Sequence, residues 1–311
     1  MNGEQATTPA AAPPDETRSV VVVKQDHRFP YSKGLMAMSL MASGLAPDRS
    51  YELATVIERK LLDRGGLDIA SVDLSLLAED VLAAEEDEVA VRHFRQWRRL
   101  DHLHKPLILL LCGATGVGKS TLATMLAHRL GVTRVTATDM VRQVLRAFFS
   151  QEFMPAVHHS SFDAEHAVRL DTTSGDPLLA GFERQVEQVS VGIKALVERA
   201  VMERTSMVIE GIHTLPSAYD ELAGLDAVMV PVVVAIEDEE LHRSHFFARG
   251  ESQSRAVERY LSAFPRIRRL QDYIVGQARA YGVAVVDGSS LDAALAEVMN
   301  LVLETIEAEL D

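Results

Sequence analysis

The stretch Gly113 to Thr121 constrains the fold of this chain more than any other feature of its sequence. It reads Gly-Ala-Thr-Gly-Val-Gly-Lys-Ser-Thr, which contains the pattern Gly-x-x-x-x-Gly-Lys-Ser/Thr, and it follows five apolar residues, 107–111. Such an apolar run is typical of a buried parallel strand. Leucines every four residues, from Leu122 to Leu130, predict a helix after the loop. Strand, loop and helix together predict a phosphate-binding loop whose backbone N–H groups face an anion at a helix N-terminus.

The residues of this loop have expected roles in holding a nucleotide. Its glycines permit positive φ angles and a close approach of the backbone to phosphate. Lys119 is expected to reach the β and γ phosphates, and Ser120 to offer its hydroxyl to Mg²⁺. We therefore expect ATP and Mg²⁺ as cofactors. The expected nucleotide-binding residues are Gly113, Ala114, Thr115, Gly116, Val117, Gly118, Lys119, Ser120 and Thr121.

Composition narrows the class of protein. A length of 311 residues suits roughly two domains, and a hydrophobic content of 47% is ample for a globular core. No apolar run approaches the roughly 18 residues of a membrane span, and residues 1–18 lack the pattern of a signal peptide. We expect a disordered tail at 1–18, a cytoplasmic location and no membrane partner. The net charge of −14 argues against nucleic-acid binding, and the single cysteine, Cys112, excludes a multi-cysteine zinc site.

The residues before the loop predict a small, mostly helical module. A strand-like run at 20–24 is followed by a turn, and Ser32 is placed to cap the first helix. Apolar periodicity then predicts further helices from about Asp48, Val72 and Glu88.

The residues after the loop predict a doubly wound parallel sheet. Four more strands are expected between helices, at 134–138, 206–213, 227–235 and 283–287. Pro231 lies inside the 227–235 strand and suggests a sheet edge or a bulge, because proline lacks a donor for the ladder.

Acidic side chains follow two of these strands at the edge where open α/β sheets bind ligands. Asp139 is expected to accept or position the proton of an attacking hydroxyl, with helix capping as the alternative, and Arg142 to hold an anion. Glu210 is expected to hold the water shell of Mg²⁺ or orient the acceptor. His213 is expected to reach the substrate, with a structural role as the alternative. The aperiodic residues 153–177 are interpreted as the acceptor-binding region.

An arginine-rich segment, 242–269, predicts a lid over transferring phosphoryl groups, because guanidinium groups match phosphate and carboxylate. It carries seven arginines and two acids, which leaves a local charge of +5 in an acidic chain. About half of the arginines are expected to be solvated helix surface. Arg243 and Arg249 are the expected catalytic arginines and Arg255 the expected nucleotide contact, because these three flank the expected lid turn at Gly250. The arginines are Arg243, Arg249, Arg255, Arg259, Arg266, Arg268 and Arg269.

Residues 19–101 resemble an ATP-cone domain. The resemblance rests on Val22-Val23-Lys24, Phe29-Pro30-Tyr31-Ser32-Lys33 and His93-Phe94-x-x-Trp97. It implies a regulatory nucleotide, for which Lys24 and Lys33 are the expected phosphate contacts. Gln25 and His27 stand where family members usually carry Arg and Gly. A cone that serves only as a rigid or oligomerising appendage is therefore the open alternative.

Residues 105–311 resemble the 2-phosphoglycerate kinase family. The matching motifs are Gly113 to Thr121, Glu210-Gly211-Ile212-His213, Arg243-Ser244-His245-Phe246 and Tyr260-Leu261-x-x-Phe264-x-x-Ile267-Arg268-x-x-Gln271-Asp272-Tyr273. Members join an ATP-cone to a P-loop kinase and make 2,3-bisphosphoglycerate from ATP and 2-phosphoglycerate.

The resemblance implies a P-loop kinase of the doubly wound α/β class with an ATP-cone-like N-terminal domain, acting on a small anionic phosphorylated substrate. A homo-oligomer, if one forms, is expected to assemble through the N-terminal domain. Two alternatives stay open. One is a kinase for another small acceptor, such as a nucleoside, sugar or inositol phosphate, and the other is a non-catalytic nucleotide-sensing regulator.

Overall fold

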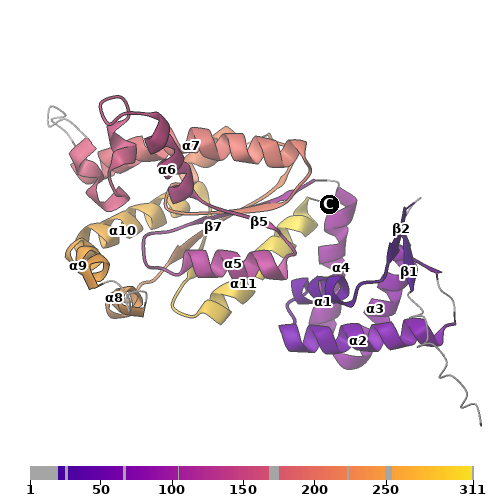
Figure 1. Ribbon diagram of the computed structural model, residues 1–311. Helices are drawn as coiled ribbons and strands as arrows, with labels where there is room; N and C mark the ends of the chain where they lie inside the picture. Colours follow the sequence, from indigo (N-terminus) through magenta and orange to yellow (C-terminus); the bar gives the residue numbers. More distant parts are fainter. Residues whose placement is uncertain are drawn as a thin grey trace, which may run out of the picture.

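The structure is a computed structural model that describes residues 20–24, 27–65, 68–103, 105–167, 175–222, 224–248 and 254–309. The expected tail at 1–18 and the expected lid turn at Gly250 lie outside the described residues. The chain forms two bodies of secondary structure around two sheets (Figure 1).

The N-terminal body packs four helices beside a three-stranded sheet of order β2-β1-β3. β1 and β2 form the expected hairpin, whereas β3 pairs parallel with β1 and was not expected from the sequence. Its buried side chains form a hydrophobic cluster of their own, which includes Leu53, Ile57 and Phe94. The elements are β1 (Val21–Lys24), β2 (His27–Pro30), α1 (Lys33–Ala42), α2 (Pro47–Asp63), β3 (Asp68–Ala70), α3 (Ser71–Glu85) and α4 (Glu88–Leu103).

The second body is built on a parallel five-stranded sheet of order β5-β6-β4-β7-β8. The P-loop strand β4 lies at the centre and is buried along its whole length. All five expected strands are present, so the predicted doubly wound α/β sheet is confirmed. The strands are β4 (Leu107–Cys112), β5 (Arg134–Ala137), β6 (Met207–Glu210), β7 (Val228–Ala235) and β8 (Ala284–Asp287).

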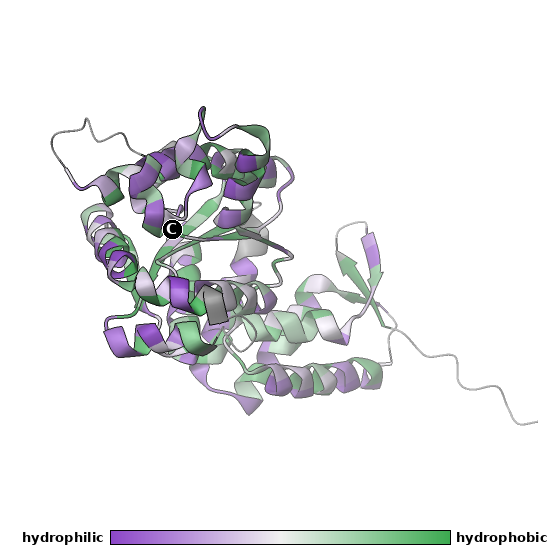
Figure 2. Cartoon of the chain, turned by 60° about the vertical axis from the view of Figure 1, so that its left-hand side comes forward, coloured by the Kyte–Doolittle hydropathy of each residue, from purple (hydrophilic) through white to green (hydrophobic). Residues whose placement is uncertain are grey.

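Helices cover both faces of this sheet because the side chains of β4 alternate between them. Leu107, Leu109 and Leu111 join a cluster with α5 and α11, whereas Ile108 and Leu110 join one with α7. Figure 2 shows the central strands as largely hydrophobic, with hydrophilic residues on the outer helices. The helices are α5 (Lys119–Arg129), α6 (Thr138–Phe148), η1 (Pro155–His158), η2 (Ser161–Ala167), α7 (Pro177–Met202), η3 (Pro216–Leu222), α8 (Glu239–Ala248), α9 (Ser254–Ser262), α10 (Phe264–Tyr281) and α11 (Leu291–Ala308).

Pro231 corrects one expectation, because β7 is an interior strand and Pro231 pairs with Leu110 of β4. On its other side β7 pairs with β8 only from Val232 onward. At Pro231 one flank of the strand is therefore still unpaired. The missing N–H donor is tolerated there for the same reason that it is tolerated at a sheet edge.

The two bodies meet where α4 lies against α11 (Figure 1). Gln96 on α4 donates a hydrogen bond of 2.6 Å to Glu307 on α11, and the Lys105 ammonium lies 2.9 Å from Glu309. Among the described residues, no helix is long and apolar enough to span a membrane.

Candidate active site

The loop after β4 has the backbone of a phosphate cradle. The φ angles of Gly113, Gly116 and Gly118 are 156°, 95° and 86°. Residues other than glycine rarely adopt such positive φ angles. Space is restricted at two of them. A Cβ on Gly113 would lie 2.4 Å from the carbonyl oxygen of Val234, and one on Gly116 would lie 2.5 Å from the ring of Phe246. Conformation therefore favours glycine at all three positions, and packing adds to this at Gly113 and Gly116.

Three side chains meet at the start of α5. Lys119 is only 9% exposed, and its ammonium donates to the carbonyl oxygen of Ala114 at 3.1 Å. The Ser120 hydroxyl donates to Glu210 at 2.9 Å, and Glu210, at the end of β6, is 7% exposed. This arrangement joins a cation, a hydroxyl and a carboxylate beside a loop of inward-turned amides.

The oxygen pair of Ser120 and Glu210 fits Mg²⁺, which prefers hard oxygen ligands and keeps several waters. Within the described part of the chain, no group of three or more His, Cys, Asp or Glu side chains could hold a metal ion by itself. The protein oxygens would thus hold the ion together with nucleotide phosphates and water, as is typical of phosphate-loop enzymes.

A small cavity of about 190 Å³ opens directly beside these groups. Lys119, Ser120 and Glu210 line it together with residues of α6, of the segment between η1 and η2, of η2 and of α9. The lining residues are Thr115, Lys119, Ser120, Ala137, Asp139, Arg142, Ser160, Ser161, Phe162, Glu210, Gly211, Ile212 and Tyr260.

Asp139 and Arg142 form an ion pair on the α6 wall, with Arg142 Nε 3.1 Å from Asp139 Oδ1. The Asp139 side chain is 69% exposed, whereas that of Arg142 is 14% exposed and also donates to the carbonyl oxygens of Val157 and His159. Partial desolvation works to raise the pKa of Asp139. The positive charges of Arg142 and Lys119 and the hydrogen bond from Arg142 outweigh it and lower that pKa. The carboxylate is therefore ionised at neutral pH and available as a hydrogen-bond acceptor.

His213 does not reach the cavity, contrary to the expected substrate contact. It is fully buried, and burial lowers the pKa of its imidazole to about 3. Both ring nitrogens are used: Nδ1 lies 2.8 Å from the Thr138 hydroxyl and Nε2 lies 2.9 Å from Gln185 Oε1. Gln185 in turn donates to the carbonyl oxygen of Ala156 and accepts from Ser161. The neutral histidine thus joins α6 to the segment around η1 and η2, and both of these line the cavity.

Most described lid arginines bind protein groups. Arg259 and Arg266 both lie 3.0 Å from Asp163 in η2, and Arg269 lies 2.7 Å from Asp176. Arg268 donates to the carbonyl oxygens of Ile236 and Glu237. The local charge of +5 is therefore neutralised largely from within the chain.

Among the described residues, no lid arginine lines the cavity beside the phosphate loop, so no contact supports the expected catalytic role of these arginines. The exposed Arg243 places its guanidinium carbon 4.3 Å from the ring centroid of Phe264, which is a cation–π contact. Arg249 and the side chain of Arg255 lie outside the described residues. Their expected roles stay predictions.

The first lid helix, α8, holds the phosphate loop through two histidines that sequence reasoning did not select. His242 Nε2 lies 2.9 Å from the carbonyl oxygen of Thr115, and His245 Nδ1 lies 3.0 Å from that of Gly116. The His242 ring also stacks on Phe246. The sequence carried no signal for these two contacts, because the partner carbonyl groups lie about 130 residues away from the histidines.

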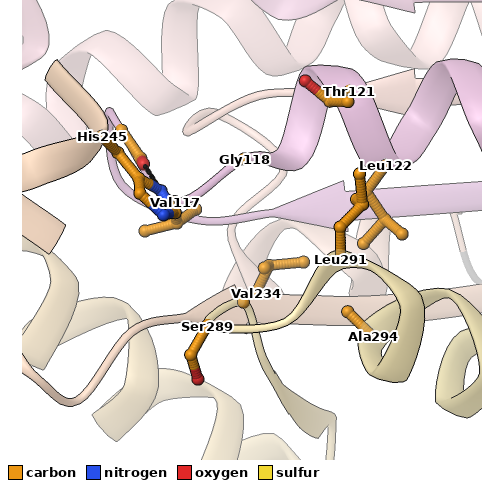
Figure 3. A pocket seen from close by; sticks show the side chains of 11 residues that line it. Val117, Gly118, Thr121, Leu122, Val234, His245, Ser289, Leu291 and Ala294 are labelled. Atoms are coloured by element: carbon orange, nitrogen blue, oxygen red, sulfur yellow. Dashed lines mark hydrogen bonds between the residues drawn. The ribbon is translucent and has the colours of Figure 1, made fainter. Parts of the chain in front are cut away.

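A second cavity, of about 320 Å³, lies on the other side of the loop (Figure 3). Its side chains are mainly apolar, and it extends from the loop to the turn between β8 and α11. It has the size and character of a site for a nucleobase and ribose. Sequence reasoning found Gly116, Val117, Gly118 and Thr121 but missed the rest of the lining, which is Leu122, Val234, His245, Gly288, Ser289, Leu291 and Ala294.

Comparison with known proteins identifies the family to which this architecture belongs. No protein-family model matches the chain. A 2-phosphoglycerate kinase of Methanopyrus kandleri is 33% identical over 302 residues, which cover 96% of this chain and 91% of the relative. One from Thermococcus kodakarensis is 35% identical over 280 residues, covering 90% and 95%. The chain belongs to the 2-phosphoglycerate kinase family.

A gluconokinase structure from Sinorhizobium meliloti shares 13% identity and covers 65% of this chain and 93% of its own. The TM-score is 0.35, which is too low to carry an argument. Membership of the 2-phosphoglycerate kinase family therefore rests on the curated relatives and on the near-complete coverage of both chains.

Within this member of the 2-phosphoglycerate kinase family, the expected regulatory contacts of the N-terminal body stay predictions. The Lys33 ammonium lies 2.8 Å from Glu58 and 5.4 Å from the ring centroid of Tyr51, so its charge is already partnered. The side chain of Lys24 lies outside the described residues.

Cys112, at the end of β4, is fully buried, and burial raises the pKa of its thiol to about 12.

Proposed function

We propose that the chain is an ATP-dependent kinase that phosphorylates the 3-hydroxyl of 2-phosphoglycerate and gives 2,3-bisphosphoglycerate and ADP. The observation that carries the proposal is one cavity that joins the phosphate-loop groups Lys119, Ser120 and Glu210 to the ion pair of Asp139 and Arg142. It occurs in a chain that matches 2-phosphoglycerate kinases over nearly its whole length.

The donor side of the reaction would be held by the loop and by α5. The loop amides and Lys119 would bind the β and γ phosphates, with the nucleoside in the 320 Å³ cavity. Mg²⁺, bound by the phosphates, Ser120 and Glu210, would neutralise charge on the transferring group. Lys119 would stabilise the additional charge that develops on the γ-phosphoryl oxygens in the transition state.

The acceptor would occupy the smaller cavity. Its 3-hydroxyl oxygen attacks the γ phosphorus, the bond to the β-γ bridging oxygen breaks, and ADP leaves. The ionised Asp139 would accept the hydrogen bond of that hydroxyl, hold it in line and take its proton as the bond to phosphorus forms. Arg142, whose charge Asp139 offsets only in part, would face the anionic groups of the acceptor.

Because most described lid arginines are paired, few of them are available to bind an anionic acceptor. Arg259, Arg266 and Arg269 already meet carboxylates, so the positive charge near the acceptor comes chiefly from Lys119 and Arg142. A cavity of about 190 Å³ is also smaller than the roughly 300–1,000 Å³ of drug-sized sites. The small volume supports a short acceptor; because Arg142 is itself paired with Asp139, support for an anionic acceptor comes mainly from the 2-phosphoglycerate kinase relatives.

We further propose that residues 19–101 and 105–311 are separate domains, with the tail at 1–18 before them. The support is the separate sheet and hydrophobic cluster of the N-terminal body. ATP or dATP regulation through that domain, assembly of copies through it, the cytoplasmic location and the absence of nucleic-acid partners all stay predictions.

The test is a set of initial rates with ATP and 2-phosphoglycerate, 3-phosphoglycerate, glycerate or neutral polyols, each at several salt concentrations. 2-Phosphoglycerate is expected to give the highest kcat/KM, and this value should fall as salt screens the anion. If glycerate or a polyol matches it, a kinase for another acceptor is the better reading. Nucleotide binding without transfer to any of these acceptors would instead favour a nucleotide-sensing regulator.

A further inference from the structure

Two hydroxyl groups of the acceptor cavity remain without an assigned role. Tyr260 on α9 and Ser160 between η1 and η2 both line the cavity, and both belong to segments outside the phosphate loop. α9 and the η1–η2 segment are about 100 residues apart in sequence, and the hydrogen bond from Arg259 to Ser160 holds them together. Ser160 lies in the segment 153–177 that the sequence predicted to bind the acceptor, whereas Tyr260 was noted only as part of a family motif.

Aromatic packing fixes the Tyr260 ring. It stacks on Phe246 with centroids 5.3 Å apart and meets Phe162 edge-on at 5.8 Å. Both neighbours are almost fully buried. In the described part of the chain the Tyr260 hydroxyl makes no hydrogen bond, although phenol groups in partly buried sites usually find a partner. A rigid ring thus presents an unused donor at the cavity.

Ser160 is held by the lid in a complementary way. Its Oγ accepts a hydrogen bond of 2.7 Å from Arg259, which also bonds Asp163 at 3.0 Å. A hydroxyl that accepts through its oxygen still has its own proton to donate. The nearby guanidinium favours that donation toward a negatively charged acceptor.

We propose that Tyr260 and Ser160 bind the phosphate group that the acceptor already carries, and so distinguish phosphorylated hydroxy acids from unphosphorylated ones. This inference rests on the proposed function and deepens it. The two hydroxyl groups donate to phosphate oxygens, while Arg142 supplies positive charge on the adjoining wall. The reacting hydroxyl is then left to the other polar groups of the lining, which are Asp139, Lys119 and Ser120. Tyr260 and Ser160 act as specificity-determining residues.

The decisive variant is Tyr260→Phe, which removes one hydroxyl and keeps the aromatic packing. A lost hydrogen bond to a charged group predicts a rise in the KM for 2-phosphoglycerate of about 10-fold or more, with kcat and the KM for ATP within twofold. Ser160→Ala should act in the same direction. Tyr273→Phe is the matched control, because the Tyr273 hydroxyl bonds Glu183 and lines neither cavity.

Calorimetric titration of the full chain with 2-phosphoglycerate, without nucleotide, gives a readout independent of turnover. Tyr260→Phe should weaken this binding by the same factor. The affinity of inorganic phosphate, measured by its competition with 2-phosphoglycerate, should fall in parallel. An active parent whose Tyr260→Phe variant keeps an unchanged acceptor KM overturns this inference and leaves the proposed function standing. Equal rises in both KM values also overturn it, since they indicate a general lid role. A parent inactive on 2-phosphoglycerate overturns the proposed function itself.

Discussion

The glycine-rich loop and the arginine-rich lid are equally conspicuous in the sequence, yet only the loop has a shape that its own residues determine. The shape of the loop resides in the φ angles of Gly113, Gly116 and Gly118, which are local properties. The role of a lid arginine depends on which acid it meets. Arg259, Arg266 and Arg269 meet Asp163, Glu165 and Asp176, about 100 residues earlier in the chain. Backbone function can thus be read locally, whereas the function of a charge depends on tertiary partners.

Removing the loop cation tests the stronger side of this comparison and has the largest expected effect. Lys119→Ala should raise the barrier to phosphoryl transfer by at least about 3 kcal/mol, roughly a 100-fold loss of kcat or more, because the ammonium stabilises charge on the transferring group. Stability, followed by urea unfolding, should change far less. Lys105→Ala, which removes a surface ammonium paired with Glu309, is the matched control. Activity of Lys119→Ala within tenfold of the parent would contradict a catalytic loop.

Two alanine substitutions separate conformation from packing within the loop. Gly118→Ala should cost about 1–2 kcal/mol, because φ is positive but no atom lies within 4 Å of the new Cβ. Gly116→Ala should cost about 1–3 kcal/mol more, because its Cβ would lie 2.5 Å from the buried Phe246 ring. Urea unfolding and ATP titration measure both variants.

The packing explanation has its own control. Phe246→Leu, combined with Gly116→Ala, should recover part of the lost stability by removing the ring that the new Cβ meets. Equal costs for the two glycine variants would show that backbone strain alone accounts for the loop.

The buried His213 predicts a pH effect that comes from tertiary structure alone. Its folded pKa of about 3 lies below the ordinary value near 6.5, so the unfolded chain binds a proton that the folded chain does not. Its contribution to stability is complete above about pH 6.5 and is lost progressively as pH falls from there toward 3. Between pH 6.5 and 5, His213→Gln should flatten the slope of unfolding free energy by up to about 1.4 kcal/mol per pH unit. An unchanged slope would contradict a neutral buried imidazole.

The smallest effect is expected at the lid. Arg266→Ala breaks ion pairs with Asp163 and Glu165 that remain partly exposed, so it should cost no more than about 1 kcal/mol. The KM values for ATP and acceptor should stay within twofold of the parent, measured beside the melting temperature. A large rise in either KM, at unchanged stability, would mean that Arg266 binds a reactant. It would then support the predicted role of the lid in binding phosphoryl groups.

The sequence predicted the features that short-range patterns determine. The strands around β4, the loop and the helix α5 followed from apolar runs, glycine spacing and periodicity. Strand β3 did not, because three residues carry too little pattern and depend on pairing with β1. At the site, the Ser120–Glu210 pair and the Asp139–Arg142 pair connect residues that the sequence selected. The burial of His213, the contact of His242 with the loop and the 320 Å³ cavity all depend on distant segments of the chain coming together.

Cys112 gives this chain a practical property. It is the only cysteine in the sequence, its side chain is fully buried in the central strand, and its raised pKa keeps it as an unreactive thiol. Reagents that alkylate thiolates should therefore leave the folded parent unlabelled. A cysteine introduced at an exposed position, such as Phe247 on α8 or Glu297 on α11, would be a reactive group without competition from Cys112. A fluorophore or spin-label pair at these two sites could then follow the distance between lid and core during turnover without first removing a native cysteine.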